Sequence, residues 1–219
     1  MGHWVELETP SGTISAWRAE PAIPARGALV VVQEIFGVNA HIRAVTDRFA
    51  AHGYVALAPA LFDHFEKHVE LGYDAEGTAY GRELVERLGF DRAVEDVRAA
   101  ADALADAAQV GVVGFCWGGT VAFLSCARIG LPAVSYYGGR TVPFLHEQPH
   151  APLLLHFGEQ DPIIPPADIE KHQEALTKAE IHIWPAGHGF NCDQRADYNA
   201  TVAVQALQRT LAFFGAHLK

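Results

Sequence analysis

The stretch QVGVVGFCWGG, residues 109–119, sets one cysteine among closely spaced glycines after an apolar run. An uninterrupted apolar run of this length is typical of a strand buried on both faces. The residues after Cys116 have helical spacing up to Gly130, which can end a helix. Cys116 is therefore expected in a sharp turn from strand to helix. Gly114 and Gly118 have no Cβ, so the two elements can approach closely.

The letters GFCWG match the G-x-S-x-G nucleophile elbow, with cysteine at the serine position. Such a turn exposes its side chain above the sheet, and the helix N-terminus behind it favours the reactive thiolate. Two other interpretations of the stretch stay open. One is a buried cysteine packed as a small hydrophobe. The other is a phosphate loop of the G-x-G-x-x-G type, but this needs an acid at the end of the next strand, and residues 131–139 contain none.

Strand-like and helix-like runs alternate along the rest of the chain. The strand-like runs cover residues 27–33, 54–59, 109–115, 131–139, 151–161 and 180–190. The helix-like runs cover residues 40–53, 74–89, 90–108, 117–130, 165–179 and 196–218, and residues 59–73 are loop-like. This alternation predicts an α/β fold with a mostly parallel central sheet flanked by helices. Residues 3–9 and 13–19 predict an N-terminal hairpin of antiparallel strands.

Two further residues suggest a catalytic triad. An α/β-hydrolase fold carries its triad in the chain order nucleophile, acid, histidine. After Cys116, Asp161 ends the apolar run of residues 151–161, and His188 lies in the glycine-rich loop after the following strand. Each residue could have an ordinary structural role, since aspartates often cap turns. Their order nevertheless predicts Cys116 as nucleophile, Asp161 as orienting acid and His188 as base.

The first buried strand leads into the segment VVVQEIFGVN, residues 30–39. In this fold the loop after that strand supplies one backbone N–H of the oxyanion hole, and the residue after the nucleophile supplies the other. The expected donors are Ile35 and Trp117. Glu34 is unusual, because a carboxylate at the end of an apolar strand is costly unless it is paired. It is either a solvated loop residue or a partner of the thiol.

Composition narrows the possible partners. The chain has 219 residues, 50% of them hydrophobic, and a formal net charge of −10. It has no basic run, so nucleic acids and anionic membranes are not expected partners. Three cysteines argue against a disulfide framework, and the N-terminal residues resemble neither a secretion signal nor a membrane span. We expect one domain over residues 1–219, a cytoplasmic location, no cofactor and no metal, and a monomer or small homo-oligomer.

Four segments together resemble the dienelactone hydrolases, or carboxymethylenebutenolidases. They are QEIFGVN (33–39), GFCWGG (114–119), GEQDPIIP (158–165) and AGHGF (186–190), and the resemblance covers essentially the whole chain. It implies a carboxylic ester hydrolase whose Cys-His-Asp triad opens a cyclic enol ester of chlorocatechol degradation through a thioester. It also implies that Glu34 hydrogen-bonds the resting thiol until substrate displaces it.

The chain departs from this family where the substrate is held. Family members carry an arginine a few positions after the catalytic histidine, whereas here Cys192 and Asp193 come first and Arg195 follows. They also carry an arginine before a tyrosine ahead of the long helix, whereas here Tyr80 precedes Arg82. The reaction class is expected to survive these changes, but the exact substrate is open. The substrate-binding candidates are Phe36, Tyr80, Arg82 and Arg195.

Other residues are assigned structural roles. His64 and His68 have a spacing that can bind zinc on a helix, but they fall in a predicted loop, so a solvated loop or lid is expected there. Cys126 and Cys192 are expected to be structural. The alternative functions are a broader esterase or acyl transferase acting on small esters, lactones or thioesters, a non-catalytic binding protein, and a metal-dependent hydrolase that a chelator would inactivate.

Overall fold

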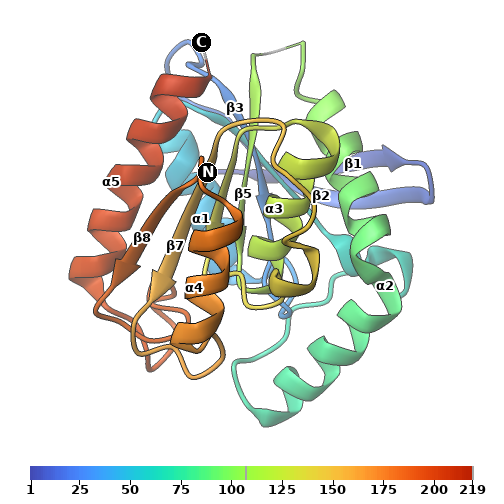
Figure 1. Ribbon diagram of the computed structural model, residues 1–219. Coiled ribbons are helices and arrows are strands. Elements are labelled where there is room, and N and C mark those ends of the chain that lie inside the picture. The colour runs from blue at the N-terminus through green and yellow to red at the C-terminus, as the bar shows by residue number, and fades with distance from the viewer. Residues whose placement is uncertain (107, 219) are drawn as a thin grey trace.

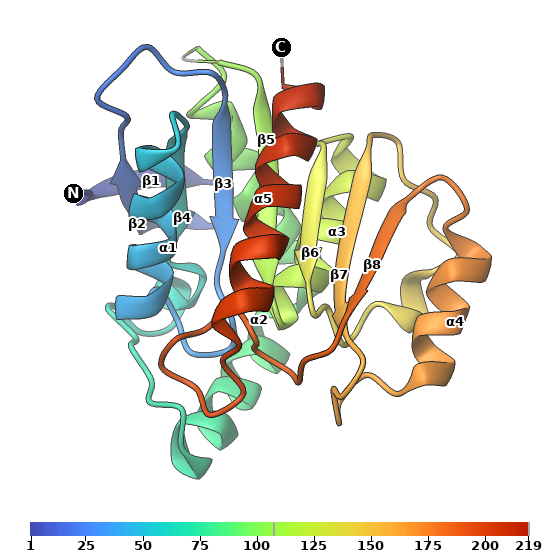
Figure 2. The same cartoon turned by 90° about the vertical axis from the view of Figure 1, so that its left-hand side faces the viewer.

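The computed structural model describes residues 1–106 and 108–218. Its centre is one eight-stranded sheet with the order β1-β2-β4-β3-β5-β6-β7-β8 (Figures 1 and 2). The strands are β1 (His3–Thr9), β2 (Gly12–Ala19), β3 (Ala28–Val32), β4 (Val55–Pro59), β5 (Val110–Phe115), β6 (Ala133–Tyr136), β7 (Leu153–Gly158) and β8 (Glu180–Trp184). The strands from β3 to β8 pair in parallel, and β1 and β2 form an antiparallel hairpin that joins β4. The predicted α/β architecture is confirmed.

Helices cover both faces of this sheet. They are α1 (Ala40–Ala51), α2 (Ala75–Asp102), α3 (Trp117–Ile129), α4 (Pro166–Ala175) and α5 (Ala200–His217), with short 3₁₀ turns η1 (Leu61–His64) and η2 (Val142–Phe144). Figure 2 shows α1 and α5 on one face, and α2 and α3 lie on the other. Both faces of the central strands are therefore withdrawn from water, which explains why all residues of β3 and β4 are apolar and buried. Across residues 1–106 and 108–218, no helix is both long and apolar enough to cross a bilayer.

The register of the parallel strands brings distant segments to one edge of the sheet. Val32 pairs with Gly114, and Phe115 pairs with Tyr136. Because parallel strands end at the same edge, the residues that follow β3, β5 and β7 converge there, and the loop after β8 joins them.

The helix boundaries differ in detail from the sequence prediction. Residues 74–89 and 90–108 were expected to form two helices, and they form the two halves of α2, which bends at Gly89, where φ is 72°. Helix α2 ends at Asp102, and residue 107 of the predicted helix lies outside the described residues. The predicted terminal helix 196–218 begins only at Ala200, because the Asn199 side chain accepts the Val202 N–H as an N-cap.

Candidate active site

Cys116 lies in the turn between β5 and α3 with a strained backbone. Its φ of 54° and ψ of −118° are values that residues with a side chain rarely adopt. Backbone hydrogen bonds hold the turn: the Cys116 N–H donates to the Tyr136 carbonyl at 3.0 Å, and the Gly119 N–H donates to the Cys116 carbonyl at 2.9 Å. A Cβ on Gly114 would collide with the Gly118 carbonyl oxygen. The close strand–helix approach predicted from these glycines is confirmed.

The structure brings Cys116, His188 and Asp161 into one hydrogen-bonded chain. His188 Nε2 lies 3.2 Å from the Cys116 sulfur, and His188 Nδ1 lies 2.7 Å from Asp161 Oδ2. The other oxygen of Asp161 accepts the backbone N–H groups of Ile163 and Ile164 at 2.7 and 3.2 Å. These bonds fix the carboxylate, and the carboxylate in turn fixes the ring and its tautomer.

Electrostatics favour the protonated form of His188. Burial alone would lower the pKa of His188, but the negative charge of Cys116 and the hydrogen bonds that the ring donates to Asp161 and Cys116 outweigh it and raise that pKa to about 10. A protonated imidazole beside a sulfur is the arrangement that sustains a thiolate nucleophile at neutral pH. The Tyr137 ring packs 5.1 Å from the imidazole and helps to keep water away from it.

A pocket opens over the sulfur. It is lined by Ile35, Phe36, Thr78, Arg82, Cys116, Trp117, Gly139, Arg140, Ile163, His188 and Arg195. The two expected oxyanion-hole residues, Ile35 and Trp117, thus border the same space as Cys116. The lining contains three arginines and no acid, although acidic residues outnumber basic ones by 26 to 16 in the chain. The pocket is therefore suited to a small molecule that carries negative charge.

Tyr80 does not join this pocket. Its hydroxyl donates to Glu66 Oε2 at 2.6 Å on the exposed side of α2. The expectation that Tyr80 contacts substrate is therefore not supported by its position, whereas Thr78 and Arg82 of the same helix line the pocket. Residues 78 and 82 are four apart and share a helix face, and residue 80 is rotated by roughly 200° from residue 78.

Glu34 is fully buried beside the pocket, where its carboxylate is paired. Tyr73 donates its hydroxyl to Oε2 at 3.2 Å, and Arg195 donates Nη1 to Oε1 at 3.3 Å. Asn39 in turn donates to the Tyr73 oxygen at 3.1 Å. Among the described residues these are the hydrogen bonds given to the carboxylate, so the expected bond to the Cys116 thiol is not one of them. The solvated loop position considered for Glu34 is therefore wrong.

Tyr73 was not singled out from the sequence. It lies in the predicted loop 59–73, which folds back so that the Leu71 N–H donates to the Phe36 carbonyl at 3.0 Å. Burial followed by the charge of Glu34 raises the pKa of Tyr73, so it remains a hydrogen-bond donor. The only hint in the sequence was the need of a buried carboxylate for partners.

The two histidines considered as a zinc pair have separate environments. His64 Nε2 lies 2.8 Å from Asp96 Oδ2, and both side chains are buried. His68 is exposed, and its ring lies 6.0 Å from that of Trp4. The expectation of a solvated segment holds for His68 and is wrong for His64, which Asp96 draws into the protein.

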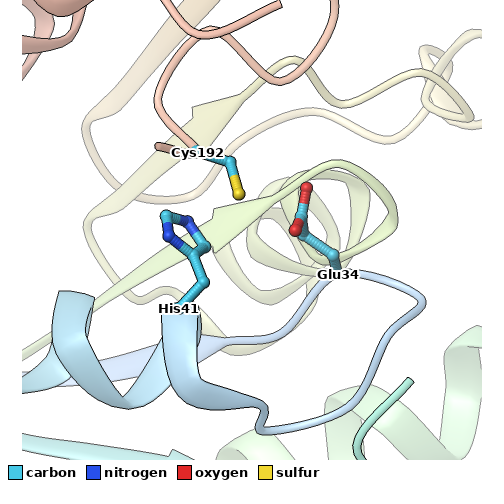
Figure 3. Close-up of side chains that lie close together, drawn as sticks. All are labelled: Glu34, His41 and Cys192. Carbon is cyan, nitrogen blue, oxygen red and sulfur yellow. The ribbon is translucent and has the colours of Figure 1, made fainter. Parts of the chain in front are cut away.

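The other two cysteines are buried. Cys126 donates its thiol to the Ala151 carbonyl at 3.2 Å, as expected of a core residue. Cys192 lies in a buried cluster with Glu34 and His41, in which one ligand-type atom from each residue lies within 4.8 Å of the others (Figure 3). Burial, followed by the charge of Glu34, raises the pKa of Cys192 to about 11. Residues 34, 41 and 192 come from three separate segments, so the sequence alone did not indicate this cluster.

Comparison with known proteins gives one consistent result. The sequence profile described as the Dienelactone hydrolase family matches residues 14–218. A protein of Synechocystis sp., provisionally named carboxymethylenebutenolidase, is 38% identical over 228 aligned residues, which cover 94% of this chain and 93% of that protein. One from Yersinia pestis with the same provisional name is 36% identical over 86% of this chain and 78% of its own. A crystal structure from Klebsiella pneumoniae, provisionally described as a dienelactone hydrolase, superposes with a TM-score of 0.87 at 31% identity over 98% of each chain.

Proposed function

The chain belongs to the dienelactone hydrolase family and is a carboxylic ester hydrolase, and from this premise we propose that it opens a small cyclic enol ester through a thioester on Cys116. The observation that carries the proposal is the chain of contacts from the Cys116 sulfur to His188 at 3.2 Å and from His188 to Asp161 at 2.7 Å. It supplies a nucleophile, a base and an orienting acid in the order and geometry that acyl transfer requires.

The first half of the reaction forms the thioester. The Cys116 thiolate attacks the ester carbonyl carbon, and the negative charge that develops on the carbonyl oxygen is stabilised by the N–H groups of Ile35 and Trp117. The tetrahedral intermediate collapses by breaking the ring C–O bond. The oxygen leaves as an enolate, and the proton on His188 neutralises it.

The second half restores the enzyme. His188, now neutral, takes a proton from a water molecule, and the resulting hydroxide attacks the thioester carbonyl. The C–S bond breaks, the carboxylic acid product is released, and Cys116 leaves as the thiolate beside the protonated imidazole. Asp161 keeps the His188 imidazole oriented in both halves of the reaction, and the net reaction consumes one water.

Three pocket residues are proposed to hold the substrate. Arg82 and Arg195 would attract an anionic group, and Phe36 would pack against the apolar part of the ring. Because Arg195 also holds Glu34, an anion that draws the guanidinium into the pocket would loosen this carboxylate beside the reaction centre. No step requires a cofactor or a metal. We further propose a single domain that acts in the cytoplasm on a small-molecule substrate, as a monomer or small homo-oligomer.

The test is steady-state hydrolysis of cis- and trans-dienelactone and of p-nitrophenyl acetate. Wild type is compared with Cys116→Ala, and Cys126→Ser serves as a control for a buried thiol away from the pocket. We expect wild type and the control to open dienelactone faster than the simple ester, Cys116→Ala to lose at least about 10³-fold in kcat, and EDTA to have no effect. Turnover of the simple ester alone through Cys116 would favour the broader esterase. Activity that survives Cys116→Ala, or is lost with EDTA, would overturn the mechanism.

A further inference from the structure

A second set of ligand-type groups lies around Glu34, next to the active site, and consists of Glu34, His41 and Cys192. Glu34 follows β3, His41 lies in the first turn of α1, and Cys192 lies in the loop after β8. All three side chains are buried, with exposed fractions of 0%, 1% and 0%. Figure 3 shows the His41 ring with one edge toward the Cys192 sulfur and the Glu34 carboxylate. The Glu34 carboxylate has partners in Tyr73 and Arg195, whereas a buried polar group that is left unpaired costs free energy.

His41 has a nitrogen without a partner. Among the described residues, its Nε2 is buried and accepts or donates no hydrogen bond. Its other nitrogen, Nδ1, lies 3.5 Å from Asp193 Oδ1. A histidine that binds a metal through one nitrogen commonly has its other nitrogen held by a carboxylate, which fixes the ring and the tautomer. The free Nε2 is therefore in the condition expected of a ligand atom.

We propose that Glu34, His41 and Cys192 form a binding site for one divalent transition-metal ion, zinc above all. A thiolate, an imidazole and a carboxylate are the donors that zinc takes, and a water completes four-coordination. The three donor atoms lie within 4.8 Å of one another. Bonds of about 2.0 to 2.3 Å would place them about 3.5 Å apart, so binding draws the side chains together by roughly an ångström.

The charges of the site accommodate such an ion. Binding deprotonates Cys192, whose proton passes to solvent. The negative charges of Cys192, Glu34 and Asp193 then balance the ion together with the guanidinium of Arg195. Arg195 lines the catalytic pocket and also contacts Glu34, so the proposed metal site and the pocket share this side chain.

The site would regulate hydrolysis without taking part in it. A metal bound to Glu34 competes with Arg195 for the same carboxylate, so added zinc is expected to free this guanidinium and to shift the KM of an anionic substrate. The inference does not depend on the proposed reaction, because the binding of the ion can be measured directly.

The test uses Co²⁺ as a spectroscopic probe for the zinc site. Reduced, metal-free protein is titrated with Co²⁺ and followed by its visible ligand-field bands and by the near-ultraviolet band of a cobalt–thiolate bond. The variants are Cys192→Ser, which removes the proposed sulfur, His41→Gln, Cys116→Ser, which removes the catalytic thiol, and Cys126→Ser as the matched buried-thiol control. Circular dichroism checks that each variant is folded.

We expect wild type, Cys116→Ser and Cys126→Ser to bind one equivalent of Co²⁺ with a thiolate band, which Zn²⁺ then displaces. We expect Cys192→Ser to lose that band and His41→Gln to bind at least about tenfold more weakly. If the thiolate band disappears in Cys116→Ser, the ion sits on the catalytic pair and the proposal is wrong. Lack of stoichiometric binding by wild type overturns it as well. Both decisions hold even if Cys192→Ser does not fold.

Discussion

The molecule contains two sets of a cysteine, a histidine and acids, and they differ in almost every respect except composition. In the first, Cys116 is half-buried at a pocket and contacts His188 at 3.2 Å. In the second, Cys192 is buried and His41 Nε2 has no hydrogen-bond partner among the described residues. Burial lowers the pKa of His41, while the pair with Cys116 and Asp161 raises that of His188. Access and hydrogen-bond geometry thus decide which set can attack an ester.

The largest contrast is expected when the two histidines are replaced in turn. His188→Gln removes the proposed base and should lower kcat/KM for p-nitrophenyl acetate by about 10³-fold or more. His41→Gln alters a group that does not line the pocket and, among the described residues, has no hydrogen bond to the sulfur of Cys116, so its loss should stay below about tenfold. Equal losses in the two variants, with both proteins folded, would show that the second set takes part in the chemistry.

The two thiols should also differ in reactivity. Native protein at pH 7 is treated with iodoacetamide and digested, and the alkylation of each cysteine is followed by mass spectrometry. Cys116 should be modified at least about 100-fold faster than Cys192, because it is more accessible and shares a hydrogen bond with His188. Cys126 is the internal reference for a buried thiol. Rapid modification of Cys192 would mean that the second set opens to solvent.

The contributions of His188 and His41 to stability should depend on pH in opposite directions. The folded-state pKa of His188 is raised from 6.5 to about 10. Its contribution to the free energy of unfolding is therefore full below pH 6.5 and is lost as the pH rises toward 10. The pKa of His41 is lowered, so its contribution is full above pH 6.5 and is lost as the pH falls. Each effect is worth on the order of 1.4 kcal/mol per unit of pKa shift.

Urea unfolding of wild type, His188→Gln and His41→Gln between pH 4 and 10 checks these signs. The difference in the free energy of unfolding between wild type and variant should shrink at alkaline pH for His188→Gln and at acid pH for His41→Gln. Parallel curves for the two variants would contradict the assigned directions.

The smallest effect is expected from the outer carboxylate of the second set. Asp193 is 54% exposed and lies 3.5 Å from His41, so Asp193→Asn should change kcat/KM by less than about twofold. Asp161→Asn is the matched change in the first set, where the carboxylate is buried and bonded at 2.7 Å, and it should cost at least about 10²-fold. A comparable loss for Asp193→Asn would place this residue in the catalytic machinery.

The sequence was most informative where local pattern and backbone geometry coincide. The continuous apolar runs predicted the central strands, and the spacing of Gly114 and Gly118 predicted the turn that carries Cys116. The chain order of nucleophile, acid and histidine was enough to choose Asp161 and His188, because parallel strands deliver their ends to one edge.

Side-chain direction and tertiary contacts were harder to predict. Tyr80 was chosen although Thr78 lies on the face of α2 that meets the pocket, and the helix orientation depends on close packing of Gly81 against the Ile35 carbonyl. The partners of Glu34 come from the loop at Tyr73 and from Arg195, more than 150 residues away in the chain. The local periodicity of the sequence does not indicate contacts between residues that lie so far apart in the chain.

The left-handed backbone of Cys116 has a consequence for protein engineering. Glycine adopts such φ values at little cost, whereas a side chain at φ 54° is strained. A directed-evolution screen that rewards only heat resistance should therefore favour Cys116→Gly and yield a more stable protein that lacks the proposed nucleophile. At residue 116, selection for stability and selection for the proposed activity thus favour different residues.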